Sequence, residues 1–371
     1  MHKINSVIIL SVLFLSGCWD QNLLKDASLI NSIAFDLEDS GQVSTTVSIR
    51  SLQGSEGTGE QKIHTDTFTE VDSTPRGSRD KIDLEVAKKI NASKIQVLLI
   101  GEKLAKKEFY PTLDVFYRDP KSALNAKLAV VNDQAKEVIK LGSEVNVSVG
   151  EYISDLLTSA EDLTMANDFD IQTVGTIILD PGRDIAIPMI HRVNHKTAKV
   201  VGLALFNNNV YSGMVLNKQD TTMYYLLAGH LSKIARFTKK IDDSGSVKDF
   251  ITFEVTDLKR KLTVQAKKPQ SVIVNINLVL KTKVVEYPKN KLDSQKEIDK
   301  LNKLLSKKMT EKAQNITVQL QEANCDALGI GRRMIALHPH VWKDLDWRKV
   351  YPTITFKTDV KVDITQKGIT N

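Results

Sequence analysis

Cysteine is scarce in this sequence, which has Cys18 and Cys325 as its two cysteines in 371 residues. If Cys18 is modified, as argued below, Cys325 has no partner within the chain, and no intrachain disulfide can form. A metal site built on paired cysteines is excluded for the same reason. Packing alone must then hold the fold, which a chain of this length can achieve.

Long hydrophobic runs and strong charge of one sign are also absent. Beyond the first residues, no apolar stretch approaches the ~20 residues of a membrane-spanning helix. The net charge is +6, from 51 basic and 45 acidic residues, and no long basic run occurs. Because nucleic-acid binders carry concentrated basic patches, we expect no nucleic-acid partner. Hydrophobic residues make up 42%, an ordinary globular share.

Recognisable catalytic motifs are missing as well. The sequence has no Gly-x-Ser-x-Gly, no P-loop and no His-Glu-x-x-His. His191 and His195 fall in a segment typical of strand and turn, and His338 and His340 flank a proline without a nearby residue to complete a zinc site. We therefore expect a protein that is not an enzyme and that holds neither a metal nor a cofactor.

The N-terminus has the pattern of a bacterial lipoprotein signal peptide. A short basic start precedes an apolar run over residues 4–15, which ends on Leu15-Ser16-Gly17-Cys18. This predicts a signal peptide over residues 1–17 and a diacylglycerol-modified Cys18 as the first residue of the mature chain. Two or more acyl chains hold a protein stably on the outer face of a membrane. The alternatives are an ordinary secretory peptide or an uncleaved anchor with a chance cysteine.

The first two-thirds of the mature chain divides by its secondary-structure pattern. Strand and helix signals alternate after residue 75, which predicts an N-terminal α/β domain over residues 18–145. The pattern then becomes rich in strands, and Asn207-Asn208-Asn209 is typical of a hairpin turn. This predicts a β-rich middle domain over residues 146–240, followed by a polar linker.

The last third predicts a long helix packed on a sheet, over residues 245–371. Apolar residues recur every three or four positions from 298 to 323, between strands predicted near 272–280 and 351–364. Ser294 and Glu297 have the spacing of a capping box that would begin this helix. The predicted fold class is α+β, with three mixed α/β domains.

Candidate structural or interface residues follow the long helix. Gly329 and Gly331 are expected to supply a left-handed cap and a turn, with Asp326 holding that turn by hydrogen bonds to backbone N–H groups. Trp342 and Trp347 could anchor a partner, since large aromatics are enriched at interface hot spots. The alternative is that they close the C-terminal core. Cys325 is expected to be a small buried residue.

Several short motifs, in this order, resemble one known family. They are Cys18-Trp19-Asp20, Gly101-Glu102, Leu113-Asp114, Arg118-Asp119, Val201-Gly202-Leu203-Ala204-Leu205-Phe206, Asp326-Ala327-Leu328-Gly329-Ile330-Gly331, and the Trp342 and Trp347 segment. The chain is similar along its whole mature length to the Ger(x)C family, the C-subunit lipoproteins of nutrient germinant receptors in endospore-forming bacteria. It departs from the family at residues 21–25, where a glutamate more often follows Trp-Asp.

The resemblance implies a non-enzymatic lipoprotein component of a receptor that is required for the spore germination response. Its partners would be two multi-spanning membrane subunits, A and B, at the outer face of the spore inner membrane. The resemblance also implies three mixed α/β domains, and the soluble part is expected to be monomeric. The alternative function is a lipoprotein that binds a small nutrient solute, which would need two similar lobes joined by a hinge. A surface hydrolase would need a nucleophile or metal constellation.

The lipid anchor gives a direct prediction for Cys18. Cys18→Ala removes the acylated thiol, so we expect the protein to leave the membrane fraction for the soluble fraction on fractionation of cells. Cys325→Ala is the matched control and should stay with membranes. A Cys18→Ala variant that is still fully membrane-retained would mean that the acyl chains are not the main anchor.

Overall fold

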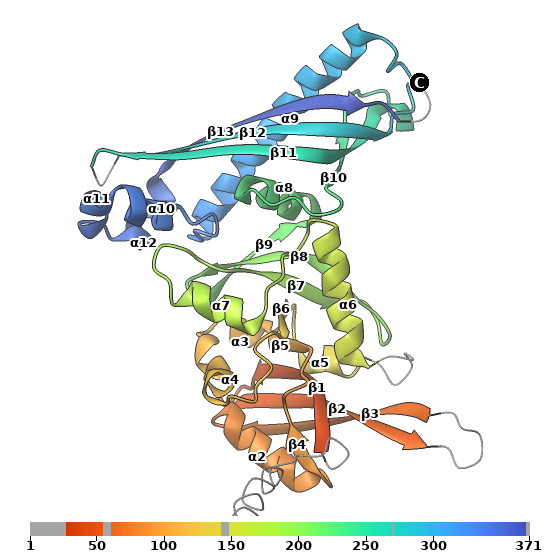
Figure 1. Ribbon diagram of the computed structural model, residues 1–371, viewed down its shortest axis with the longest axis vertical. Coiled ribbons are helices and arrows are strands. Elements are labelled where there is room, and N and C mark those ends of the chain that lie inside the picture. The colour runs from red at the N-terminus through yellow and green to blue at the C-terminus, as the bar shows by residue number, and fades with distance from the viewer. Residues whose placement is uncertain (1–26, 55–60, 142–147, 269–270, 369–371) are drawn as a thin grey trace, which may run out of the picture.

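A computed structural model of the chain describes residues 27–54, 61–141, 148–268 and 271–368. Cys18, the predicted signal peptide and the Trp19-Asp20 motif lie outside the described residues. The described residues form one nine-stranded and one four-stranded sheet. Figure 1 shows the two sheets one above the other along the long axis of the molecule, with the four-stranded sheet at the C-terminal end.

The nine-stranded sheet has the order β3-β2-β1-β5-β6-β7-β8-β9, and β4 also pairs with β1. Strands β1, β5, β6 and β7 pair in parallel, whereas the hairpins at both ends of the sheet are antiparallel. The strands are β1 (Ala27–Leu37), β2 (Val43–Gly54), β3 (Gln61–Asp72), β4 (Lys89–Asn91), β5 (Val97–Gly101), β6 (Lys127–Val131), β7 (Ala186–Arg192), β8 (Ala198–Asn207) and β9 (Val210–Asn217).

Helices cover both faces of this sheet. In β5, Leu98 and Ile100 pack in a core with residues of α2, η2, α4 and α7, whereas Val97 and Leu99 pack with residues of α5 and α6. A parallel strand covered on both faces is continuously apolar, which explains why residues 97–100 are Val, Leu, Leu and Ile in succession. The helices are α2 (Pro75–Glu85), α3 (Glu102–Ala105), η2 (Tyr110–Leu113), α4 (Asp114–Arg118), α5 (Lys136–Ile139), α6 (Val149–Asp162) and α7 (Ile171–Ile178).

The sheet continues across the predicted boundary at 145/146, since β6 pairs with β7. The division into N-terminal and middle domains stays a prediction. The predicted hairpin at Asn207 to Asn209 is confirmed, because Asn207 pairs with Val210 across a two-residue loop. Helix α7 lies in the segment expected to be β-rich. Its apolar sequence suits a buried strand or a helix, and the Asp170 side chain, which accepts a hydrogen bond from Thr173 N, caps it as a helix.

The four-stranded sheet, in the order β10-β11-β12-β13, carries the long helix α9 on one face (Figure 1). The buried face of α9 matches the predicted apolar stripe, and β12 alternates between buried and less buried residues. The α+β fold class with a long helix on a sheet is therefore confirmed. The elements are α8 (Lys218–Ala228), β10 (Arg236–Lys240), η3 (Val247–Asp249), β11 (Phe250–Ala266), β12 (Val272–Glu286), α9 (Gln295–Glu322), α10 (Ile330–Leu337), α11 (Pro339–Lys343), α12 (Trp347–Val350), η4 (Tyr351–Thr353) and β13 (Thr355–Gln366).

The predicted capping box at the start of α9 is wrong. Ser294 is the N-cap residue, but its side chain accepts no capping hydrogen bond. Glu297, the expected partner, instead accepts a hydrogen bond of 2.8 Å from the Tyr287 hydroxyl. The Glu297 carboxylate is thus bonded to Tyr287 and not to the backbone N–H of Ser294, as a capping box would require.

The two sheets share one hydrophobic core through α8. This core includes Leu203 and Leu216 from β8 and β9, Leu226 from α8, and Ile276 from β12, all at most 1% exposed. Figure 1 shows α8 between the two sheets. Among the described residues, no helix is both long enough and apolar enough to cross a membrane.

Candidate functional site

The candidate residues near the end of α9 meet in a buried polar cluster, which we call the Asp184–Asp326 cluster. It consists of Asp184, Asp326, Trp347 and Arg348. Asp184 lies in the loop between α7 and β7, and Asp326 follows α9, so the cluster joins the two sheets. Both carboxylates are almost fully buried, at 3% and 1% exposure. Buried charges are tolerated only when they are paired and hydrogen-bonded.

Asp184 is the most heavily bonded member of the cluster. Its two carboxylate oxygens accept two hydrogen bonds of 2.7 Å from the Arg348 guanidinium. They also accept bonds from Asp326 N, at 2.7 Å, and from Asn208 N, at 2.9 Å. A bidentate arginine–carboxylate pair fixes direction as well as distance. Asp184 therefore holds the end of α9, α12 and the β8–β9 hairpin at one point.

Asp326 holds the turn that follows α9, as the sequence predicts. Its carboxylate accepts hydrogen bonds from Ile330 N, at 2.8 Å, and from Gly331 N, at 2.7 Å. The Trp347 indole N–H donates to the same carboxylate at 3.1 Å. Burial raises the pKa of Asp326 to about 7, and the nearby Asp184 adds to this rise, whereas the backbone N–H donors oppose it.

The two candidate glycines serve different purposes. Gly329 has a φ of +68° and is the left-handed N-cap of α10. It does not end α9, which closes at Ala323 and is followed by Asn324 with a φ of +47°. Gly331 is helical, and it is needed for close packing: a Cβ there would lie 2.6 Å from Gly182 Cα. Gly329 thus has the expected left-handed conformation, although it begins α10 and does not cap α9, whereas Gly331 lies within α10 and forms no turn.

The two tryptophans lie next to each other, with ring centroids 5.5 Å apart. Trp347 is 8% exposed and packs in the C-terminal core, whereas Trp342 is half-buried at the margin of that core. Trp347 thus packs in the core and also donates a hydrogen bond to the Asp326 carboxylate. A contact between Trp342 and a partner stays a prediction.

Gly202 and Cys325 are the two remaining small residues singled out in the sequence. In β8, a Cβ on Gly202 would lie 1.9 Å from the Leu216 carbonyl oxygen, so the β8–β9 pairing needs a glycine at this position. Cys325 is fully buried, as expected, and burial raises the pKa of its thiol.

Sequence reasoning missed Asp184 and Arg348. Asp184 follows Asp180-Pro181-Gly182-Arg183, a pattern that reads as an exposed polar turn. In the structure, Arg332 N donates to Gly182 O at 2.8 Å, so this turn is pressed against the start of α10. The available signal was an acidic residue directly before the apolar segment 185–190, where its charge would be buried.

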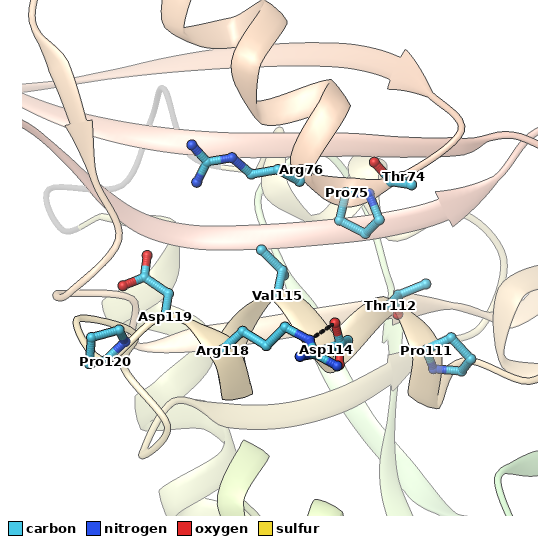
Figure 2. A pocket seen from close by; sticks show the side chains of 10 residues that line it. All are labelled: Thr74, Pro75, Arg76, Pro111, Thr112, Asp114, Val115, Arg118, Asp119 and Pro120. Carbon is cyan, nitrogen blue, oxygen red and sulfur yellow. Dashed lines mark hydrogen bonds and ion pairs between the residues drawn. The ribbon is translucent and has the colours of Figure 1, made fainter.

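A groove of about 590 Å³ lies in the N-terminal part of the molecule, between the start of α2 and the η2–α4 segment. Figure 2 shows the ten side chains that line it. They include Asp114, Arg118 and Asp119, which belong to the short motifs noted in the sequence. Arg118 Nε donates to Asp114 Oδ2 at 2.7 Å. The lining of the groove thus combines charged and apolar side chains.

The histidine pairs of the sequence do not form a recognisable metal centre. His191 lies at the exposed end of β7, and the His338 ring contacts the Val264 carbonyl oxygen at 3.1 Å. Within the ranges that the structure describes, no group of three or more His, Cys, Asp or Glu residues is arranged to hold a metal ion.

The overall fold is similar to that of a solved protein structure. The crystal structure of the GerBC protein superposes with a TM-score of 0.56 and 18% identity, covering 90% of this chain and 97% of that chain. Two family models match the sequence: Spore germination protein N-terminal domain, over residues 20–192, and Spore germination B3/GerAC like, C-terminal, over residues 201–368. The chain belongs to the Ger(x)C family of spore germination proteins.

Relatives of known name agree with this assignment. Spore germination protein GerQC of Bacillus cereus is 26% identical over 368 residues, covering 98% of both chains. Spore germination protein KC of Bacillus subtilis (strain 168) is 23% identical, covering 98% of this chain and 95% of its own. The similarity therefore extends along nearly the whole chain, as the order of the short motifs indicated.

The Asp184–Arg348 pair gives the first structural prediction. Arg348→Gln leaves the buried Asp184 carboxylate without its cation, so we expect the free energy of unfolding to fall by about 1–3 kcal/mol. Lys349→Gln is the matched control, since Lys349 is 84% exposed and pairs with Asp346. Urea unfolding of the full chain in detergent measures both. Equal stability of the two variants would contradict the proposed importance of the pair.

The backbone of Gly329 gives a second prediction. A Cβ there would meet Arg183 at 3.6 Å, an ordinary contact, so the constraint is the positive φ alone. Gly329→Val should lower the free energy of unfolding by at least about 1–2 kcal/mol, because a β-branched residue resists φ > 0. Gly329→Asn should lose less, since asparagine tolerates this conformation. A melting curve of the valine variant equal to that of the wild type would refute the conformational argument.

Proposed function

We propose that this chain is the lipid-anchored C-type component of a nutrient germinant receptor. It acts by contact with two membrane-spanning subunits, A and B, and not by catalysis. The observation that carries the proposal is that the two germination family models together match residues 20–192 and 201–368. GerQC and the KC protein, which align along nearly the whole chain, are both named as spore germination proteins.

The geometry of the Asp184–Asp326 cluster supports a role in transmitting contact. Each carboxylate oxygen of Asp184 and Asp326 accepts at least one hydrogen bond from the protein itself. A cluster satisfied in this way gives a substrate no open position, and it makes the joint between the two sheets stiff. A force or contact applied to one sheet is then passed to the other instead of being lost in a loose linker.

The predicted anchor sets how far the folded part can stand from the membrane. Ala27, the first residue of β1, lies nine positions after Cys18. A chain of that length reaches at most about 30 Å when fully extended. With acyl chains on Cys18, the nine-stranded sheet is held near the outer face of the membrane, within reach of membrane-embedded partners at the spore inner membrane.

Co-purification tests this proposal. The tagged full chain is extracted from spore inner membranes in a gentle detergent, and the proteins that purify with it are identified by mass spectrometry. We expect two multi-spanning subunits in a reproducible ratio, and a marked loss of both from the Cys18→Ala variant.

The opposite outcome has a defined meaning. Recovery of the chain alone, under conditions that keep a control membrane complex intact, would contradict the receptor proposal. It would favour the alternative of a solute-binding lipoprotein, for which the groove in Figure 2 is the place to look. A thermal-shift screen with small nutrients would then follow, because a ligand that binds only the folded state raises its stability.

A further inference from the structure

A pocket of about 320 Å³ lies between α8, β10 and α9. We call it the lysine pocket. Its basic lining residues are Lys239 and Lys240 from β10 and Lys308 and Lys312 from α9, and its acidic ones are Asp220 and Glu311. The amide side chains of Asn315 and Gln319 complete the lining. None of these residues belongs to the Asp184–Asp326 cluster or to the groove of Figure 2.

The ion pairs within the lysine pocket leave positive charge unmatched. Lys312 pairs with Asp220, and both side chains are only about 15% exposed. Lys240 pairs with Asp243, outside the pocket, and Glu311 pairs with Lys307 on the solvent side of α9. Among the described residues, no carboxylate lies within ion-pair distance of Lys239 or Lys308.

Lys239 is the centre of this imbalance. Its ammonium donates a hydrogen bond of 3.3 Å to Gln219 Oε1 and lies 5.8 Å from the centre of the Phe237 ring. The pKa of Lys239 is lowered to about 8, mainly by burial and also by the charges of Lys312 and Lys308, whereas Asp220 acts in the opposite direction. The protonated Lys239 side chain is therefore partly buried without an ion-pair partner of its own.

The part of the chain that contains most of the lysine pocket also carries an excess of positive charge. Residues 229–371 carry 28 Lys and Arg against 16 Asp and Glu, whereas residues 1–228 carry 23 against 29. The C-terminal part is thus strongly basic, although the whole chain has a net charge of only +6. A positive field around a concave site raises the local concentration of anions and speeds their arrival.

We propose that the lysine pocket binds the phosphate group of an anionic ligand. Lysine is a compact point charge with three donors, well suited to a phosphate with its several acceptor oxygens. The amides of Asn315 and Gln319 add donors that a phosphate oxygen can use. A phosphate near Lys239, Lys308 and Lys312 supplies the missing counter-charge. The ligand is either a free phosphate compound or the head group of an anionic lipid, and both offer the same chemistry.

Calorimetry with inorganic phosphate tests the site itself. The purified full chain in detergent is titrated at pH 7 and low ionic strength, where screening is weak. We expect measurable binding, about tenfold weaker in Lys239→Gln and in Lys308→Gln because each loses a charge-assisted hydrogen bond. Lys303→Gln is the matched control, an exposed lysine on α9 outside the pocket, and it should bind like the wild type. Two pocket variants are used so that one poorly folded protein does not decide the result.

The pH dependence gives an independent readout. Phosphate binds the protonated ammonium, so the affinity of the wild type should fall as the pH rises from 7 to 9, through the pKa of Lys239. Lys239→Gln has no such group and should show a smaller fall. No binding to the wild type, or equal affinity in the pocket variants and Lys303→Gln, would overturn the proposal.

Vesicles distinguish the two sources of phosphate. The chain with Cys18→Ala, which lacks the acyl anchor, is sedimented with phosphatidylcholine vesicles that contain or lack phosphatidic acid. Retention on phosphatidic acid vesicles that is reduced by Lys239→Gln and displaced by inorganic phosphate would identify a lipid head group. Calorimetric binding without such retention would identify a soluble phosphate compound. Both results support the pocket, and neither depends on the membrane-spanning partners being present.

Discussion

The bidentate bond between Asp184 and Arg348 fixes the joint between the two sheets. It crosses from the loop before β7 to α12, and the two residues are 164 positions apart in the sequence. Around it, the backbone of Asp326 and the hairpin loop at Asn208 also bond to Asp184. The Asp184 carboxylate therefore holds three parts of the fold in fixed positions: the nine-stranded sheet, the end of α9 and the C-terminal helices. The hydrophobic core through α8 provides the apolar contact between the sheets. The Asp184–Arg348 pair fixes how the sheets are oriented at that contact.

Close backbone approach explains several of the short motifs. Gly101 lies against the Asp36 carboxylate, which accepts hydrogen bonds from Ala135 N and Lys136 N, and a Cβ at Gly101 would lie 1.9 Å from that carboxylate. A Cβ at Gly202 or at Gly331 would also come too close to another segment, at 1.9 Å and 2.6 Å. In each case a polar or backbone group of another element occupies the space that a side chain would need. These motifs thus lie where separate elements of the fold contact one another.

Features that depend on residues close together in the chain could be predicted from the sequence. Features that depend on a contact with a distant residue could not. The long apolar stripe of α9, the hairpin at Asn207 to Asn209 and the turn held by Asp326 all follow from residues close in the chain. The capping box fails because Tyr287 takes Glu297. Asp184 and Arg348 were missed because nothing in either segment indicates the other. The groove and the lysine pocket likewise depend on elements that the topology brings together.

The burial of Cys325 has a practical consequence for studying this chain. Its thiol lies inside the core with a raised pKa, so it forms little of the thiolate that alkylating reagents attack. With Cys18 acylated or replaced, the native chain then offers no reactive thiol. A single cysteine introduced at any exposed position becomes the one site for a spectroscopic label or a photo-crosslinker. The surface can therefore be mapped residue by residue, in the membrane and in the presence of other proteins, without first removing a native cysteine from the core.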